Sequence, residues 1–486
     1  MFEKLRTAGK IEHYLPDCLF HLYISVMGRI KLIMSLLWMS VCECKAAMYG
    51  HVQSPLFPEP YLADLYIRWY LKVPHGYQIQ LTFNHLDIEP SVNCTKDSLT
   101  ILLDGEVLGK FCGQKSTDTH HPGNKPILSP DNHLWLLFET DSSNQGSQMH
   151  LGFFVFYQAI VVDCGIPEIA DPDLIALTEE SLLTTYKQNI SFKCLSEYYK
   201  LDGDANFTCD ANGNWISERG QNHSQNAPHC VPVCGMNKQT FSAGRVFGGQ
   251  DAKLGQIPWQ LLTKQPNRGG ASLISDRWAI TAATVVDGQQ TKTLLFYGGM
   301  IDGLDQNAVK METEKIIIHP GYKVESPVQT NYDNDIALVK MSARVPLSTN
   351  VLPVCLPEKS NGPVMEGKSG TVSGFGGTSK NPLRSRFLQH GPVKEYSEVP
   401  CFSTTLKVTD NMFCAGGDDE DVDTCKGDSG GPLVIPLLGR GSPETPYRLK
   451  GIVSWGPAKC GDKNFKGYYT KVENYLDWIR ETMENN

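Results

Sequence analysis

Short segments of alternating polar and apolar residues dominate the part of the chain from 47 to 160. Residues 78–83 alternate with period two, as in a strand with one buried face. Residues 134–138 and 153–157 are more continuously apolar, as in strands that are buried on both faces. Turn residues such as Pro-His-Gly at 74–76 separate these runs. The pattern predicts an all-β sandwich.

The remainder of the 486-residue chain is too long for one compact core. Residues 246–486 are sufficient for a double β-barrel built from short strands. In the segment 472–480 the apolar residues have helical spacing, which predicts a terminal amphipathic helix. We therefore expect a mainly β protein with a C-terminal helix.

The N-terminal region has the pattern of a secretory signal peptide. Basic residues at 29–31 precede an apolar run at 32–41, and small residues follow at 44–46. The run of about ten residues is shorter than the ~20 that a spanning helix requires. We expect 1–46 to be an upstream segment and signal peptide, with Met27 as an alternative start, and the mature protein to be secreted, with no membrane span.

Composition narrows the possible functions. The net charge of -9 argues against a nucleic-acid partner. Of the fifteen cysteines, the signal segment holds Cys18, Cys42 and Cys44, and its removal leaves an even number suited to disulfides in an oxidising compartment. Acceptor sequences for N-glycosylation agree with export and occur at Asn93, Asn189, Asn206 and Asn222.

A small cysteine-rich module occupies residues 162–232. It contains Trp215, and its cysteines are Cys164, Cys194, Cys209 and Cys230. Four cysteines permit three pairings, and spacing does not choose among them. The segment resembles a sushi (complement control protein) module, which implies pairs Cys164–Cys209 and Cys194–Cys230 around a buried tryptophan. So small a core needs these disulfides.

The segment from Asp423 to Pro432 carries Ser429 in the sequence Gly-Asp-Ser-Gly-Gly-Pro. It resembles the nucleophile loop of trypsin-like peptidases with the chymotrypsin fold. In such a loop the backbone N–H groups of Gly427 and Ser429 converge on the oxyanion formed when serine attacks a carbonyl. The alternative is a glycine-rich structural turn.

Other segments resemble the specificity pocket of the same family. Ser454-Trp455-Gly456 resembles the substrate-binding strand, and Gly456 and Gly467 match the small walls of the pocket. Asp423, six residues before Ser429, matches the pocket floor, where a carboxylate selects arginine or lysine. Taken alone, Asp423 would be a solvated member of the acidic run 418–423.

Residues 233–245 form an expected linker and activation segment. The resemblance implies cleavage after Arg245, after which the Val246 amine would pair with Asp428 and assemble the pocket. The alternative is an ordinary loop with a chance basic residue. A bridge would hold the two chains together; the family's pairs correspond to Cys234–Cys355, Cys401–Cys414 and Cys425–Cys460.

The catalytic triad has one departure. Asp335, in Asn-Asp-Ile-Ala-Leu, matches the aspartate that orients a catalytic histidine, but Thr284 stands at the histidine position. A threonine hydroxyl cannot accept the serine proton near neutral pH, and loss of the histidine in a comparable triad costs roughly 10⁶ in turnover. His319 matches a structural position instead. A sequence error at residue 284 is the alternative.

The arrangement of modules resembles one branch of this family. Gly269 and Val285 stand where many trypsin-like enzymes pair two cysteines, and Val231 to Gly235 join the sushi module to the protease. These features resemble the complement-initiating proteases, the r and s subcomponents and the mannan-binding-lectin-associated proteases. The short layout, with one front domain and one sushi module, is similar to r-subcomponent-like members.

The front domain resembles a CUB domain, in which Cys94 and Cys112 would pair. The segments 86–90 and 139–144 and the residue Asp97 resemble the calcium-binding pattern of such domains. This implies Glu89, Asp97 and Asp141 as hard oxygen ligands, which suit calcium. The alternative is three surface acids on loops.

Two functional hypotheses follow. The first is a secreted complement-type endopeptidase, specific for arginine or lysine and made as a zymogen, and Ser429, Asp335 and Asp423 favour it. The second is a non-catalytic homologue that binds a complement partner or protein substrate through its CUB, sushi or protease surfaces, and Thr284 favours it. We interpret the chain as a protease homologue with impaired catalysis.

Overall fold

The computed structural model describes most of the chain. The described residues are 18–19, 40–44, 47–115, 118–142, 149–178, 183–237, 250–323, 332–359, 369–377, 384–396, 401, 406–417, 424–437, 446–456 and 466–486. Two compact units are present: Met1–Leu195 with Leu201–His229, and Ser196–Lys200 with Cys230–Asn486. No helix among the described residues is long and apolar enough to cross a membrane.

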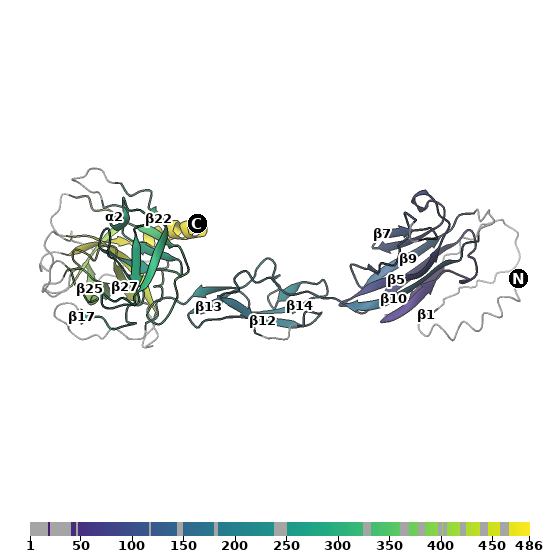
Figure 1. Cartoon of the computed structure of the whole chain (residues 1–486), viewed down its shortest axis with the longest axis horizontal. Coiled ribbons are helices and arrows are strands. Elements are labelled where there is room, and N and C mark those ends of the chain that lie inside the picture. The colour runs from purple at the N-terminus through teal and green to yellow at the C-terminus, as the bar shows by residue number, and fades with distance from the viewer. Residues whose placement is uncertain are drawn as a thin grey trace. The chain divides into compact units, whose positions relative to one another are not determined.

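The N-terminal module is a β-sandwich (Figure 1). One sheet has the order β1 (Cys18–Leu19), β2 (Ser40–Cys44), β4 (Tyr66–Lys72), β9 (His133–Glu139), β6 (Ser98–Leu103), β7 (Glu106–Phe111). The other has the order β3 (Tyr49–Gln53), β10 (Gly152–Val161), β5 (Tyr77–Asp87), β8 (Ile127–Leu128). Phe138 of the first sheet packs edge to face on Phe153 of the second, with ring centroids 5.2 Å apart.

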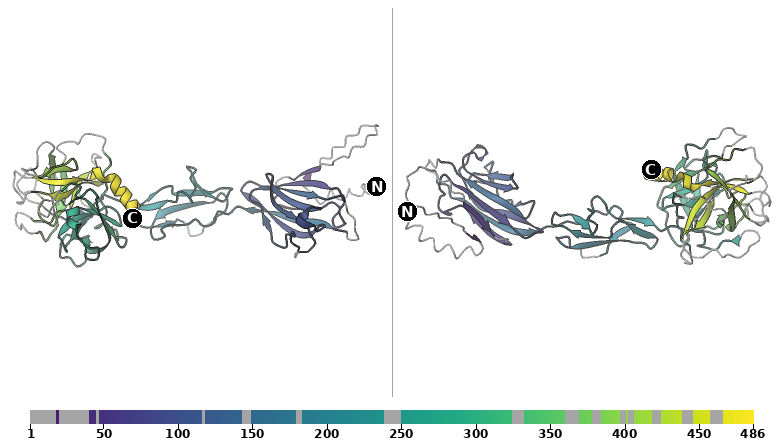
Figure 2. Two further views of the ribbon diagram at one scale, coloured as in Figure 1. Left: turned by 90° about the horizontal axis from the view of Figure 1, so that it is seen from above. Right: turned by 180° about the vertical axis from the view of Figure 1, so that it is seen from behind.

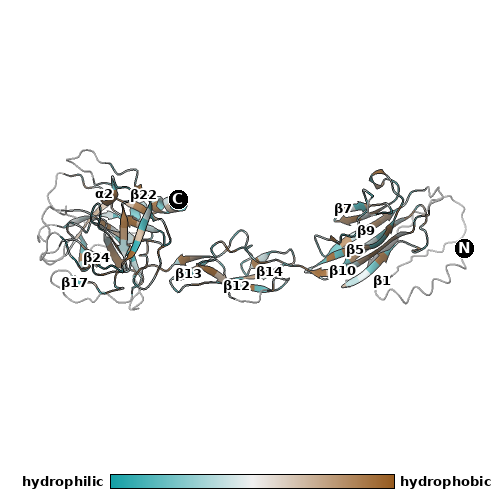
Figure 3. Cartoon of the chain, in the orientation of Figure 1, coloured by the Kyte–Doolittle hydropathy of each residue, from teal (hydrophilic) through white to brown (hydrophobic). Residues whose placement is uncertain are grey.

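The burial of these strands follows their sequence pattern in part. In the run 134–138 every residue is buried except Trp135, which is half-buried. Ile79, Leu81 and Phe83 of β5 are buried, which confirms the alternation expected there. The expectation for 153–157 is wrong: Phe154 and Phe156 lie half-buried on the outer face of β10, while Phe153, Val155 and Tyr157 are buried in the core. Figure 3 shows hydrophobic and hydrophilic segments following one another along these strands. Aromatic residues on both faces made this strand resemble a doubly buried one.

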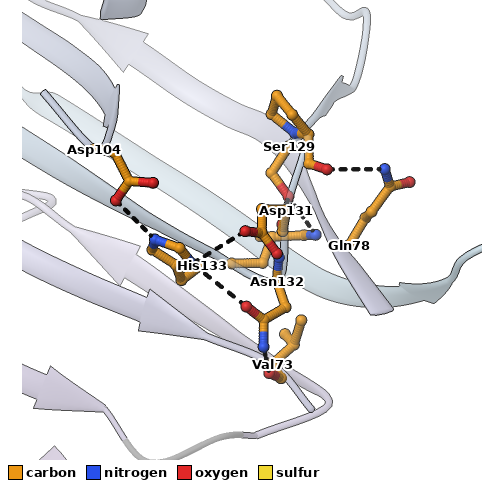
Figure 4. A network of polar contacts seen from close by, with 9 residues as sticks. Val73, Gln78, Asp104, Ser129, Asp131, Asn132 and His133 are labelled. Atoms are coloured by element: carbon orange, nitrogen blue, oxygen red, sulfur yellow. Dashed lines mark hydrogen bonds and ion pairs between the residues drawn. The ribbon is translucent and has the colours of Figure 1, made fainter. Parts of the chain in front are cut away.

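A polar network ties the loops at one end of the sandwich together (Figure 4). His133, at the start of β9, lies 3.2 Å from Asp104 Oδ1 through Nε2 and 3.3 Å from Asn132 Oδ1 through Nδ1. Asn132 Nδ2 donates to Val73 O at 3.0 Å. Because the Asp104 carboxylate is exposed, we expect this network to fix loop geometry and to add little stability.

The second module is built from two small sheets. One contains β11 (Ile175–Leu177), β12 (Asn189–Cys194), β14 (Asn206–Cys209) and β15 (Trp215–Ser217), and the other pairs β13 (Tyr199–Asp202) with β16 (His229–Pro232). Trp215 is buried and its Nε1 donates to Gly165 O at 2.9 Å. Cys164 is bonded to Cys209, and Cys194 and Cys230 are each disulfide-bonded. The small core combines the tryptophan and these disulfides with the buried side chains of Ile190, Phe192 and Phe207.

The C-terminal region contains two barrels. The first is closed, in the order β18 (Gln260–Thr263), β19 (Gly269–Leu273), β20 (Trp278–Thr281), β23 (Ala337–Met341), β22 (Val309–Ile318), β21 (Leu295–Gly298). The second has the order β17 (Gln250–Asp251), β25 (Gln389–Tyr396), β24 (Ser369–Gly374), β27 (Pro432–Pro436), β28 (Tyr447–Trp455), β29 (Gly467–Lys471), β26 (Met412–Gly416). A further pairing of β25 with β26 closes a ring of six strands.

The expected terminal helix is present. It begins as a 3₁₀ turn, η3 (Val472–Tyr475), and continues as α3 (Leu476–Glu484). Val472, Tyr475 and Ile479 pack into the same core as the first barrel. Figure 2 shows α3 beside the strands of its own unit. The mainly β fold with a C-terminal helix is therefore confirmed.

Candidate active site

Thr284 and Asp335 lie together at the first barrel. Thr284 is the second residue of the short helix α2 (Ala283–Val286), directly after β20, and Asp335 lies just before β23. The backbone N–H of Thr284 donates to Asp335 Oδ1 at 2.8 Å, and its hydroxyl donates to Oδ2 at 3.2 Å. Ser454, on β28, donates to the same Oδ2 at 2.6 Å. Three segments distant in sequence therefore meet at one carboxylate.

The Asp335 carboxyl group is completely buried, and its acidity reflects this. Burial raises its pKa from 3.8 to about 6, although hydrogen bonds from Ser454 and Thr284 act in the opposite direction. Thr284 supplies a neutral hydroxyl to the carboxylate. An imidazolium at this position would supply a positive charge, so the substitution removes a group that could stabilise the ionised acid.

The loop of Ser429 is fixed between the two barrels. The backbone oxygen of Ser429 accepts from Gly270 N at 2.8 Å, and Gly430 N donates to Val453 O at 2.8 Å. Gly430 has a φ of +82°, and a Cβ there would lie 2.2 Å from Thr281 Oγ1. Only glycine fits this position. Gly427, with φ +98°, also has the left-handed conformation that favours glycine.

Asp428 is turned into the body of the second barrel. Its Oδ1 accepts from Gly376 N at 2.8 Å and its Oδ2 from Cys425 N at 3.0 Å. The neighbouring Arg268 guanidinium donates to Phe375 O at 3.4 Å. Because Phe375 O and Gly376 N belong to one peptide group, a single peptide connects the two charged side chains. The expected cleavage site, Arg245 and Val246, lies outside the described residues.

Part of the expected pocket is also described. Gly456 and Gly467 approach closely, since a Cβ at Gly456 would lie 3.7 Å from Gly467 Cα. Trp455 stacks between Tyr332 and Tyr468, with ring centroids 5.1 and 4.3 Å apart. The two expected pocket and disulfide positions Asp423 and Cys460 lie outside the described residues.

Among the residues that the structure describes, the tyrosines and the histidine near Asp335 do not offer a base. Burial and the nearby Asp335 charge raise the pKa of both Tyr322 and Tyr475, so their hydroxyls stay protonated near neutral pH. His319 packs edge-on against Tyr475 and Trp478, and its Nδ1 accepts from Gly321 N at 3.1 Å. Its packing is that of a structural histidine, as the sequence indicated.

A second cluster of acids lies in the N-terminal sandwich. Glu89 follows β5, Asp97 precedes β6 and Asp141 follows β9, and each offers an oxygen within 4.8 Å of the others. The Tyr61 hydroxyl donates to Asp97 Oδ2 at 2.6 Å, and Asp141 N donates to Asp97 Oδ1 at 2.8 Å. Burial raises the pKa of Asp97. The Lys96 ammonium contacts Glu89, which offsets part of the negative charge.

This donor set fits a calcium ion. All three side chains offer carboxylate oxygens, the hard ligands that calcium prefers. The carboxylates converge from the ends of three strands, and Tyr61 and the Asp141 backbone hold Asp97 in place. A cation there would neutralise a cluster of like charges whose mutual repulsion also raises the pKa of Asp97.

Comparison with known proteins identifies the domain families that the chain matches. The CUB domain family matches residues 42–153, the Sushi repeat (SCR repeat) family 164–230, and the Trypsin family 246–479. The Complement C1s subcomponent of Rattus norvegicus is 30% identical over 523 residues, covering 90% of this chain and 73% of that protein. The Complement C1r subcomponent-like protein of Mus musculus is 32% identical over 486 residues, covering 93% and 94%. The chain belongs to the complement C1r/C1s serine protease family.

A further relative is named for its metal requirement. The "Calcium-dependent serine proteinase" of Mesocricetus auratus is 30% identical over 524 residues, covering 90% of this chain and 72% of that protein. The alignment with the C1r subcomponent-like protein of Mus musculus covers 94% of that protein, compared with 73% for the C1s subcomponent of Rattus norvegicus.

The disulfides of this C1r/C1s family member lie where the resemblance implied, as far as they are described. The bonded pairs are Cys94–Cys112, Cys164–Cys209, Cys234–Cys355 and Cys401–Cys414. Cys425 is also disulfide-bonded.

The histidine-loop disulfide of other trypsin-like enzymes is replaced by a packing contact. A Cβ added to Gly269 would lie 2.8 Å from Val285 Cγ1 and 3.1 Å from Ser429 O. The valine methyl groups therefore occupy the space beside Gly269 that a bridge would need. Val285 directly follows Thr284, so this contact positions α2 against the Ser429 loop.

Sequence reasoning missed one member of the site. Ser454 was associated only with the substrate-binding strand, whereas its hydroxyl makes the shortest hydrogen bond to Asp335. The one available sequence signal was that Ser454 belongs to the Ser454-Trp455-Gly456 segment, which resembles a strand of the family's active site. The contact joins β28 of the second barrel to Asp335, just before β23 of the first barrel, which no local pattern reveals.

Proposed function

We propose that this C1r/C1s family member is a secreted trypsin-like protease homologue that binds arginine- or lysine-containing protein segments and cleaves them poorly or not at all. The observation that carries the proposal is the position of Thr284, whose hydroxyl donates to Asp335 at 3.2 Å. A threonine hydroxyl is too weakly basic to take the proton of an attacking serine near neutral pH, and its contact with Asp335 does not change that. Loss of the base costs roughly 10⁶ in turnover in a comparable triad.

The remaining parts of the site retain roles in this proposal. Ser429 stands as the nucleophile, and the N–H groups of Gly427 and Ser429 form the oxyanion hole. Asp423 lies at the pocket floor, and Gly456 and Gly467 leave room for a long basic side chain. The two close-packed glycines and the fixed Ser429 loop support this assignment.

Activation is proposed to follow the zymogen route. Cleavage after Arg245 would release the Val246 amine to pair with Asp428. The buried position of Asp428, against Gly376 N and Cys425 N, supports this role because a buried carboxylate gains from a cationic partner. The Cys234–Cys355 bond would then hold the two chains together.

The front module is proposed to be a calcium-binding CUB domain over 47–160, followed by a sushi module over 162–232 and the linker 233–245 before the protease domain 246–486. Glu89, Asp97 and Asp141 would hold the ion. Calcium would supply charge neutralisation and tie three strand ends together.

The decisive experiment compares three forms of the full chain after cleavage at Arg245. The natural protein, Thr284→His and Thr284→Ser are assayed on an arginine ester, with benzamidine binding as a measure of pocket integrity. We expect all three to bind benzamidine and only Thr284→His to turn over substrate efficiently. Thr284→Ser is the matched control, because it keeps a hydroxyl beside Asp335.

A natural turnover within about tenfold of the Thr284→His rate would contradict the proposed impairment, because loss of a base produces a far larger gap. Failure of benzamidine to bind any form would contradict the basic-residue pocket. The two parts of the proposal are therefore tested separately.

A further inference from the structure

Two N-glycosylation acceptor sequences pair with each other across the second module. Asn189-Ile190-Ser191 lies at the start of β12, and Asn206-Phe207-Thr208 lies at the start of β14, the neighbouring strand (Figure 1). The strands are antiparallel, with Asn189 opposite Thr208 and Ser191 opposite Asn206. Each asparagine therefore faces the hydroxyl residue of the other sequence.

The strand pattern places all four polar residues on one face. Ile190 and Phe207, the central residues, are buried at 3% and 1% exposure and lie opposite each other in the core. Alternation then directs Asn189 and Asn206 outward, and both are exposed. A shift of one residue would bury these polar groups, so the hydrophobic pair fixes the register. Diagonal neighbours of this kind are about 7–8 Å apart.

The hydrogen bonds leave the reactive atoms available. Ser191 Oγ donates to Asn206 Oδ1 at 2.6 Å, and Thr208 Oγ1 donates to Asn189 Oδ1 at 2.7 Å. Both bonds use the amide oxygen, whereas a glycan is attached to the amide nitrogen. In that transfer, Nδ2 forms a bond to C1 of the first sugar, the C1–O bond to a lipid-linked diphosphate donor breaks, and an amide proton is released. Both cross-strand hydrogen bonds are compatible with the product.

We propose that Asn189 and Asn206 both carry N-glycans on the same molecule, so that this face of the sushi module is a paired carbohydrate surface. The inference rests on the proposed export of the protein, which supplies the lipid-linked donor. It goes beyond the presence of acceptor sequences, because it states that two glycans share one strand pair and cover one face.

The test uses the full chain secreted from mammalian cells. Intact mass is measured before and after enzymatic removal of N-glycans in ¹⁸O-water, which marks each formerly glycosylated asparagine as aspartate. We expect Asn189→Gln and Asn206→Gln each to remove one glycan, and the double variant to remove two. Ser191→Thr and Thr208→Ser are matched controls that keep the acceptor sequences and should keep both glycans.

Asn222, in the same module, separates the possible failures. If it is glycosylated while Asn189 or Asn206 is not, the paired surface is refuted and export stands. If the secreted chain carries no N-glycan, this inference fails while the proposed export stands; if the chain is retained in the cells, the proposed export fails and the inference fails with it. The proposal would also be refuted if the natural protein carried one glycan on this strand pair and each single variant still carried one, on the asparagine that remains. That result would show that the two positions exclude each other.

Discussion

Replacing Asp335 by asparagine should stabilise the protein at neutral pH. The Asp335 carboxyl is fully buried, and burial raises its pKa to about 6. Asparagine has the same shape without the charge. Its amide oxygen can accept from Thr284 N, as Oδ1 does now, and its nitrogen can donate to the hydroxyls of Thr284 and Ser454, which can turn to accept.

The size of this stabilisation follows from the shift in the pKa of Asp335. The folded pKa of Asp335 lies above its ordinary value of 3.8 by about two pH units. At 1.36 kcal/mol per unit, the ionised form costs the folded state about 3 kcal/mol. Because the folded pKa is raised, the natural protein has its full stability below about pH 4 and loses this amount as the pH rises to about 6. The variant does not share that loss.

The assay is thermal and denaturant unfolding of the natural protein and Asp335→Asn at pH 4, 5, 6, 7 and 8. The free-energy advantage of the variant should be near zero at pH 4 and about 3 kcal/mol at pH 8, or a Tm rise of about 6–12 °C for a domain of this size. An advantage that is absent at pH 8, or equal at every pH, would refute the reasoning.

A control of opposite sign is available in the same domain. The Arg386 guanidinium lowers the pKa of Asp302 to about 2. Asp302→Asn should therefore destabilise the protein at neutral pH, and the loss should fade as the pH falls from about 4 toward 2. Two variants with opposed pH profiles exclude a general effect of asparagine or of buffer.

Three other predictions concern separate parts of the chain. Gly269→Cys with Val285→Cys should form a disulfide, detected by intact mass under non-reducing conditions, because a Cβ at Gly269 would lie 2.8 Å from Val285 Cγ1. Glu395→Gln should lower the free energy of unfolding by about 1.5–3 kcal/mol, because it removes the charged hydrogen-bond partner of the partly buried Lys450. The double variant Glu395→Leu with Lys450→Met should recover most of that loss. Asp97→Asn should abolish a calcium-induced rise in the Tm of the front module, measured by calorimetry with and without chelator.

The fold could be predicted wherever one residue pattern corresponds to one environment. The alternation in β5 and the helical spacing near Tyr475 are such cases, and both elements are present. The segment around Phe154 was misassigned because a half-buried aromatic residue on an outer face looks like a core residue in sequence. Whether a side chain lies on the outer or the inner face of its strand depends on where the neighbouring sheet packs. The local sequence pattern gives no information about that packing.

The candidate site could be predicted from the sequence only where a motif requires one particular backbone conformation. The glycines around Ser429 are required by backbone conformation and close contacts, so their spacing identifies the loop. The role of Ser454 at Asp335 has no such signature, because it arises from a buried side-chain contact between residues that are far apart in the sequence and lie in different barrels. The raised pKa of Asp335 is likewise a property of the assembled core.

The environment of Asp335 bears on how the chain would tolerate the proposed loss of its catalytic base. An unpaired buried charge would cost several kcal/mol, and the Thr284 hydroxyl, the Thr284 N–H and Ser454 together offset part of that cost. An alanine at position 284 would remove one of these three donors, whereas serine would keep them all. Threonine is therefore a replacement that sacrifices the base while preserving the hydrogen bonding of the acid. The residual displacement of the Asp335 pKa shows that this compensation is incomplete, because a neutral donor cannot supply the positive charge that an imidazolium would bring. The same deficit explains why one substitution, Thr284→His, should restore both the proton acceptor for Ser429 and the counter-charge for Asp335.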